Sequence, residues 1–149
     1  QQLLAESIGK KAKGIFPIIS TMPKDNHSLM QLYLDGQKNN FYTFFSSDDK
    51  ISPKINKELV LKSKNFLINK DLQDILESQI LATQKVFKKK KIPFRSFYLK
   101  TRKEDTLGEL FAFFIIETIL IAKALKINPY NQPAVELIKK ETNKILFNS

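Results

Sequence analysis

Apolar residues recur along the chain with two different periods, and these periods predict alternating helices and strands. Residues 71–89 carry Leu72, Leu76 and Ile80 at helical spacing, which predicts an amphipathic helix. Asp71 is expected to help cap its N-terminus. Helices are also predicted at residues 1–8, 27–34, 106–125 and 133–146. Residues 10–14 are predicted to form a short basic loop, and residues 57–67 an irregular or helical connector.

Three short segments have the pattern of strands. Residues 94–99 alternate between the two faces, residues 41–45 are rich in aromatic side chains, and residues 15–19 form an apolar run. Pro17 has to lie near the start of its strand or at a sheet edge, because proline cannot donate to the ladder. The alternation of strands and helices predicts an α/β fold with helices over a mainly parallel sheet, to which a fourth or fifth strand from an upstream segment would add.

The predicted helix at residues 106–125 is apolar on nearly all sides. Its most apolar part, residues 110–125, is shorter than the roughly 20 residues that span a membrane, and Glu117 and Thr118 interrupt it. We therefore expect a buried or interface helix rather than a membrane span.

Composition narrows the classes of chemistry. The chain has 149 residues, enough for one domain with a real core, and 42% of them are hydrophobic. It has no cysteine, and His27 is its only histidine, so a disulfide, a thiolate metal site and a zinc or iron site are not expected. With four glycines and no Gly-rich phosphate motif, a nucleotide loop is not expected either.

The formal net charge of +10 comes almost entirely from lysine, since Arg95 and Arg102 are the only arginines. Recognition of nucleic acids depends heavily on arginine, so this composition argues against a nucleic-acid partner. The run of lysines at residues 88–91 could be a nucleic-acid patch, but lysines at a helix C-terminus also complement the dipole, and we interpret the run as solvated. No secretory signal and no initiator methionine are visible, and we expect a piece of a longer protein.

The stretch at residues 128–139 has the features of a helix N-terminus that could meet an anion. Pro129 ends the preceding helix, Asn131 can cap the next one, and Gln132 then lies where backbone N–H groups favour negative charge. Lys139 follows two turns inside the helix, about 9–10 Å along the axis. The spacing alone favours the simpler alternative, an ordinary capped surface helix with a solvated lysine.

Three segments resemble those of a known enzyme family. Residues 2–10 (QLLAESIGK) are similar to the glutamate segment of glucose-6-phosphate isomerases, and residues 26–33 (NHSLMQLY) to the histidine segment. Residues 128–139 (NPYNQPAVELIK) are similar to the C-terminal signature of that family, N-[PS]-F-[DN]-Q-x-G-V-E-x-x-K. The three segments occur in family order and extend over the whole chain.

The resemblance implies a role for four residues. Glu6 matches the base that moves a proton between C2 and C1 of the sugar, and His27 matches the residue that assists ring opening in the neighbouring subunit. Lys139 matches a second residue of ring opening, and Gln132 matches an amide near the sugar phosphate.

The resemblance also implies an architecture. Residues 1–149 would form most of a three-layer sugar isomerase (SIS) domain, incomplete at its N-terminal side, in a cytoplasmic homodimer that needs no metal or cofactor and has no nucleic-acid or membrane partner. The complete protein would interconvert glucose 6-phosphate and fructose 6-phosphate in glycolysis and gluconeogenesis. The alternative is a non-catalytic SIS module that only binds a sugar phosphate.

Some features depart from the family pattern. Ala134 replaces a usual glycine, Ile138 replaces another residue that is often glycine, and residues 113–118 lack the tyrosine and histidine of many relatives. The family's Ser/Thr phosphate loop and an arginine near the reacting carbons have no match in this chain. We therefore expect these 149 residues alone to be inactive.

Overall fold

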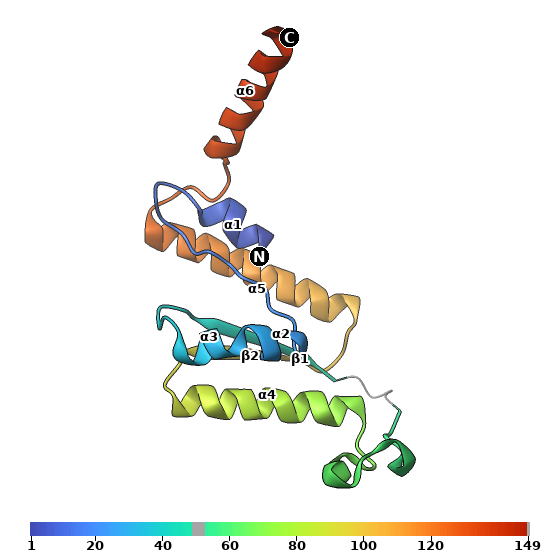
Figure 1. Ribbon diagram of the computed structural model, residues 1–149. Coiled ribbons are helices and arrows are strands. Elements are labelled where there is room, and N and C mark those ends of the chain that lie inside the picture. Colours follow the sequence, from blue (N-terminus) through green and yellow to red (C-terminus); the bar gives the residue numbers. More distant parts are fainter. Residues whose placement is uncertain (49–52, 149) are drawn as a thin grey trace. The chain divides into compact units, whose positions relative to one another are not determined.

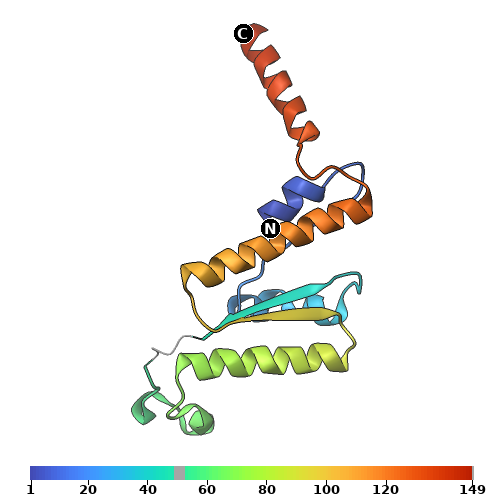
Figure 2. The same cartoon turned by 180° about the vertical axis from the view of Figure 1, so that it is seen from behind.

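The chain folds into two compact units. The computed structural model describes residues 1–48 and 53–148. The first unit consists of Gln1–Ile19 and Leu107–Ser149, and the second of Ser20–Thr106. The chain thus starts in the first unit, forms the whole second unit, and returns to the first, as the ribbon can be followed from front and back (Figures 1 and 2).

A two-stranded parallel sheet lies at the centre of the second unit. Strand β1 (Tyr42–Ser47) pairs with β2 (Phe94–Leu99) in a register that places Tyr42 opposite Phe94. Both strands were predicted from the aromatic and alternating patterns, and the parallel pairing agrees with the predicted α/β class. The predicted connector contains two 3₁₀ helices, Lys57–Leu59 and Lys62–Leu67.

Helix α4 (Leu72–Lys89) returns the chain from β1 to β2 and lies along one face of the sheet (Figures 1 and 2). Asp71 forms a reciprocal capping box with Asp74: each side chain accepts the other's backbone N–H, at 2.8 and 3.1 Å. Because these bonds satisfy donors that have no partner inside the helix, the helix starts where the sequence predicted it.

Phe87 of α4 anchors the core of the second unit. Its side chain is 1% exposed, and its ring contacts those of Tyr42, Phe44 and Phe94 edge to face, at centroid distances of 5.0 to 6.1 Å. These partners point to the same side of the sheet, because residues two apart on a strand share a face. The cluster therefore accounts for Tyr42 and Phe44 of β1 and for Phe94 of β2.

The helix predicted at residues 27–34 is two short helices, α2 (Lys24–Ser28) and α3 (Met30–Asp35). Leu29 separates them with φ −116° and ψ −18°, away from regular helical values. The apolar spacing continues across the break, which is why the sequence pattern predicted one helix. Gly36 follows the last residue of α3, and a Cβ there would lie 2.4 Å from the carbonyl oxygen of Leu32.

The prediction of a third strand at residues 15–19 is wrong for the structure described. The segment belongs to no strand, and Ile15, Phe16, Ile18 and Ile19 are all more than half exposed. Pro17 has no N–H to donate, and its carbonyl oxygen instead accepts a bond from the Gln1 side chain at 3.1 Å. An apolar run indicates side chains that are favourable to bury, but it does not specify a partner strand for backbone hydrogen bonds.

The first unit contains helices α1 (Gln2–Ile8), α5 (Glu104–Leu125) and α6 (Pro133–Asn148); the boundary with the second unit falls in the first turn of α5. Its core is small: Ile8 and Ala122 are fully buried, and Ile127 is 8% exposed. Leu4, Ile121 and Leu125 pack around these three residues.

Helix α5 was expected to be buried or to form an interface. Within this chain Thr118 and Ala122 are its buried residues, while Phe111, Ile116 and Leu120 are more than half exposed. Much of the apolar surface of α5 is therefore not buried within this chain. That α5 forms an interface stays a prediction. Within the described residues, no helix is both long enough and apolar enough to cross a membrane.

Candidate functional site

A carboxylate and an amide from opposite ends of the chain meet in the first unit. The side-chain nitrogen of Gln132 donates to Oε2 of Glu6 at 3.2 Å, although the two residues are 126 positions apart. The side-chain nitrogen of Gln2 donates to the other oxygen of Glu6, Oε1, at 2.8 Å. Both oxygens of the carboxylate are thus held by amide donors, and the side chain stays exposed to solvent.

Local structure explains each half of this contact. Gln2 and Glu6 lie four residues apart on α1, so both side chains project from the same helix face. Gln132 directly precedes α6, and its carbonyl oxygen accepts the first N–H bonds of that helix, from Val135 and Glu136 at 3.2 and 3.3 Å. The residue that precedes the helix is therefore Gln132, so the prediction of Asn131 as its cap is wrong, whereas Pro133 begins the helix as predicted.

Lys139 lies on α6 but is not joined to Glu6 in the part of the chain that the structure describes. Its Nζ pairs with Oε1 of Glu136 one turn back, at 2.7 Å, and both side chains are more than half exposed. An exposed pair of this kind contributes little stability, so the lysine remains available to a ligand at small cost.

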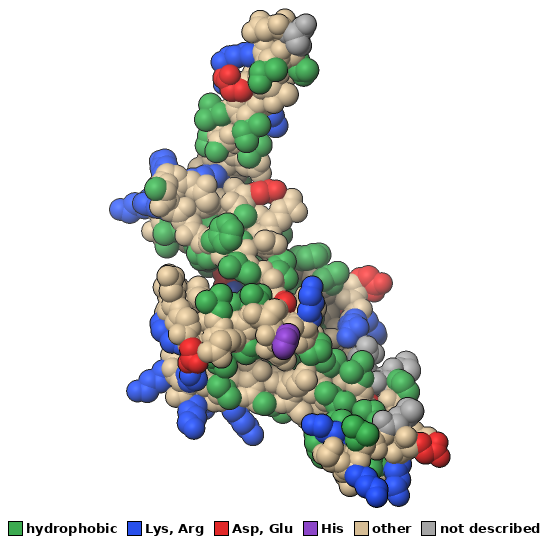
Figure 3. Space-filling view, in the orientation of Figure 1, with side chains coloured by type: hydrophobic (Ala, Val, Ile, Leu, Met, Phe, Trp, Pro, Cys, Tyr) green, Lys and Arg blue, Asp and Glu red, His purple; other side chains and the backbone are tan. Residues whose placement is uncertain are grey.

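His27 lies in the second unit, on α2, where its side chain is exposed. In the space-filling view it is the one purple residue at the surface (Figure 3). The predicted site residues are therefore divided between the units: Glu6, Gln132 and Lys139 belong to the first and His27 to the second.

A hollow of about 270 Å³ opens in the first unit between residues that follow α1 and residues around the start of α6. Its surface is mostly apolar, and two lysines and two asparagines are among the residues that line it. The described residues that line it do not include Glu6, Gln132 or Lys139. They are Gly9, Lys10, Lys11, Ile127, Asn128, Asn131, Pro133 and Ala134.

Two lysines near the site, Lys10 and Lys13, make contacts that the sequence did not reveal. Lys10 Nζ donates to the carbonyl oxygen of Asn128 at 2.6 Å, and Lys13 Nζ to that of Leu125 at 3.0 Å. In the sequence they belong to a short basic loop. Backbone carbonyl acceptors have no signature in side-chain type, so no sequence signal could have identified these partners.

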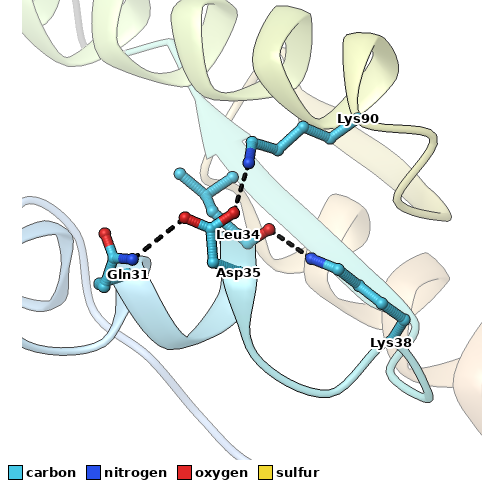
Figure 4. A network of polar contacts seen from close by, with 5 residues as sticks. All are labelled: Gln31, Leu34, Asp35, Lys38 and Lys90. Atoms are coloured by element: carbon cyan, nitrogen blue, oxygen red, sulfur yellow. Dashed lines mark hydrogen bonds and ion pairs between the residues drawn. The ribbon is translucent and has the colours of Figure 1, made fainter.

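A second polar network ties α3 to the end of α4 in the second unit (Figure 4). Lys90 Nζ donates to Oδ1 of Asp35 at 2.5 Å, Gln31 donates to Oδ2 at 3.0 Å, and Lys38 donates to the carbonyl of Leu34. The Lys90 hydrogen bond and charge hold the pKa of Asp35 below its ordinary value of 3.8. This network is structural, and it gives one member of the lysine run a specific partner.

A metal centre is not evident among residues 1–48 and 53–148, where no three histidine or carboxylate side chains gather. The chemistry that the described contacts allow is proton transfer by Glu6, with Gln132 and Gln2 fixing the direction of its carboxylate.

Comparisons with known proteins show which proteins this chain is similar to. No protein-family model matches the chain. A glucose-6-phosphate isomerase of Mycoplasmopsis pulmonis is 40% identical over 98% of this chain and 35% of its own length. One of Methanocaldococcus jannaschii is 35% identical over 94% of this chain and 34% of its own length, and a probable one of Methanococcus maripaludis is 31% identical over 99% and 33%.

The chain is homologous to glucose-6-phosphate isomerases. The similarity extends over about 98% of the chain, which confirms the resemblance found in the three segments. The chain spans about a third of the length of these relatives.

A solved structure shares the fold of this isomerase homologue. A hypothetical protein from Thermus thermophilus superposes with a TM-score of 0.88, over 97% of this chain and 36% of the other, at 24% sequence identity. At this level of identity the likeness shows the fold alone.

Proposed function

We propose that this chain is the C-terminal portion of a glucose-6-phosphate isomerase with the sugar isomerase fold. The complete protein would interconvert glucose 6-phosphate and fructose 6-phosphate without a cofactor. The observation that carries the proposal is the 3.2 Å contact between Gln132 and Glu6, because it joins two of the three segments that resemble the family. Homology over nearly the whole chain supports it.

Glu6 is the proposed base. In the open-chain form of glucose 6-phosphate it takes the proton from C2 while O1 gains a proton, which gives a cis-enediol(ate). The same carboxyl group then returns its proton to C1 while O2 loses one, and fructose 6-phosphate results. A carboxylate suits both directions, and the two amide donors that hold Glu6 keep its oxygens in a defined orientation.

The other three residues have supporting roles in this proposal. Lys139 acts in ring opening at the ring oxygen, which requires it to leave or share Glu136. His27 assists ring opening in the active site of a second subunit, so the working assembly is a homodimer. Gln132 contacts the region of the sugar phosphate, and the helix N-terminus behind it favours a negative charge.

The proposal predicts that the 149 residues by themselves do not isomerise fructose 6-phosphate, because the main phosphate-binding loop of the family has no match in them. A coupled assay that reduces NADP as glucose 6-phosphate forms measures this directly. The complete protein is expected to be active in the same assay. Robust turnover by the 149-residue chain alone would refute the prediction that activity requires a phosphate-binding loop from outside these residues.

Glu6→Gln in the complete protein separates the proposal from its alternative, a module that only binds a sugar phosphate. We expect kcat to fall by about 10²–10⁴, since a general base is lost while the shape of the side chain is kept. Binding of 6-phosphogluconate, measured by calorimetry, should change less than threefold. Glu141→Gln is the matched control, because Glu141 is an exposed partner of Lys144 on α6.

Two results decide against catalysis by Glu6. If Glu6→Gln keeps the turnover of the Glu141→Gln control, Glu6 is not the base. If the complete wild-type protein binds 6-phosphogluconate but shows no turnover, the binding module is the correct function.

A further inference from the structure

A tight turn after α1 projects two lysines toward the end of α5. Lys11 and Ala12 both adopt left-handed backbone conformations, with φ of 55° and 56°. Residues other than glycine adopt this conformation at a cost of roughly 1 kcal/mol or more each, so two in succession require support from their surroundings. The turn is closed by the N–H of Lys13, which donates to the carbonyl oxygen of Lys10 at 2.9 Å.

The two lysines that flank this pair bind the last residue of α5 and the segment after it. Lys13 binds the carbonyl oxygen of Leu125, the last residue of α5, and Lys10 that of Asn128, three residues further. A helix C-terminus has unpaired carbonyls and a partial negative charge, so two ammonium groups are favourable there. We call Lys10 and Lys13 the lysine clasp.

The segment held by the clasp leads directly to Gln132. Ile127 is buried, and its N–H donates to the carbonyl oxygen of Ala122 at 3.0 Å. The side chain of Asn128 then accepts the N–H of Tyr130 at 2.9 Å and turns the chain toward α6. Both of these bonds join residues within 122–132. The bond from Lys10 to Asn128, in contrast, ties the loop between α5 and α6 to the segment that follows Glu6.

Packing of α6 cannot position Gln132. Every described residue from Asn131 to Asn148 is exposed, so the helix buries no side chain against the rest of the first unit. The position of Gln132 relative to Glu6 therefore depends on the loop before the helix. In that loop, Lys10 provides a bond from the α1 side within a few residues of Gln132.

We propose that Lys10 is a positioning residue of the isomerase site: its bond to Asn128 holds the loop so that the amide of Gln132 reaches the carboxylate of Glu6. This inference rests on the proposed function for its catalytic consequence. A misplacement of about 1 Å near reacting groups costs up to about 100-fold in rate, so a loosened loop should affect turnover more than substrate binding.

The kinetic test compares Lys10→Met with Lys126→Met in the complete protein. Methionine keeps the apolar stem and removes the ammonium group, and Lys126 is an exposed lysine on the same loop without a side-chain bond in the described structure. We expect Lys10→Met to lower kcat 10- to 100-fold with less than a threefold change in KM. Lys126→Met should stay within twofold of wild type.

The conservative variant adds a readout that a general loss of stability would not produce. Lys10→Arg keeps a cationic donor that can reach the carbonyl oxygen of Asn128, and it should recover at least a third of the wild-type kcat. Equal losses in Lys10→Met and Lys126→Met, or an equal loss in Lys10→Arg and Lys10→Met, would overturn the proposal.

Amide hydrogen exchange in the 149-residue chain tests the clasp without reference to catalysis. Lys10→Met should speed exchange at the N–H of Tyr130 at least tenfold relative to Lys126→Met. If the wild-type protein proves inactive while this exchange difference is found, the proposed function fails and the clasp stands. If exchange is unchanged, the clasp itself is wrong.

Discussion

The two units are stabilised in different ways. In the second unit, aromatic rings from β1, β2 and α4 meet around Phe87, and a capping box starts the helix that carries it. Among the described residues of the first unit, Ile8, Ala122 and Thr118 are buried, and lysine ammonium groups bind backbone carbonyls more than 100 residues away. Three of the four candidate site residues lie in the first unit.

The difference indicates what each kind of contact is suited to do. A ring cluster excludes water and tolerates little change in shape, so it specifies a rigid scaffold. Hydrogen bonds between exposed segments bury little and leave polar side chains such as Glu6 open to a ligand. In enzymes, functional groups commonly lie on loops and helix ends, and a rigid scaffold positions them.

Removal of the central ring should have the largest effect on the second unit. Phe87→Ala leaves a cavity among at least three rings and should lower the free energy of unfolding by about 3–5 kcal/mol, as measured by urea denaturation of the 149-residue chain. Phe45→Ala is the control, because Phe45 is 49% exposed, whereas Phe87 is 1% exposed, and the ring of Phe45 stacks on that of Phe97. Its loss should be about 1 kcal/mol. Equal losses would contradict the assignment of Phe87 as the anchor.

Two glycines of the first unit should respond to alanine with opposite signs. Gly14 has φ +117°, and a Cβ there would lie 2.7 Å from the carbonyl oxygen of Ile8, so Gly14→Ala should destabilise by about 1–3 kcal/mol. Gly108 lies within α5 with nothing within 4 Å of a Cβ, so Gly108→Ala should stabilise by about 0.5–1 kcal/mol. Thermal unfolding of both variants measures this. If Gly14→Ala is neutral, the turn that carries the clasp is not under conformational constraint.

The smallest expected effect concerns the ion pair of Asp35 with Lys90. Because the folded pKa of Asp35 lies below its ordinary value of 3.8, the folded state binds fewer protons than the unfolded state in that range. The contribution to stability is complete above about pH 3.8 and is lost as the pH falls through the lower folded pKa.

Asp35→Asn should therefore lower the urea midpoint slightly at pH 6, and this effect should shrink as the pH is lowered below 3.8. The difference should also shrink in 1 M salt, which screens an exposed pair. In a Lys90→Met background Asp35→Asn should change the midpoint much less. An unchanged effect in that background would show that Lys90 is not the partner that matters.

Local patterns in the sequence predicted much of the second unit. The alternation in residues 94–99 and the Asp71 cap depend on neighbours along the chain, and the structure confirms both. The break at Leu29 escaped prediction because the apolar spacing is the same on both sides of it. The strand predicted at residues 15–19 failed because pairing requires a partner strand, which an apolar run does not specify.

The candidate site was only partly accessible from the sequence. Similarity to known isomerase segments indicated Glu6, His27, Gln132 and Lys139, and the roles of these residues stay predictions. Composition and spacing alone did not distinguish Gln132 from an ordinary helix cap. The clasp lysines were recognised only as basic residues, because their acceptors are backbone carbonyls.

The sequence by itself determined most of the helices and both strands of the sheet, where α4 and α6 begin, and which known enzymes the chain resembles. These properties depend on residues close together in the chain or on side-chain identity. Only the tertiary structure decided that β1 pairs with β2, that Gln132 reaches Glu6, and that Lys10 binds the loop between α5 and α6. Those contacts join distant positions, and their formation depends on how whole elements pack, which no local pattern records.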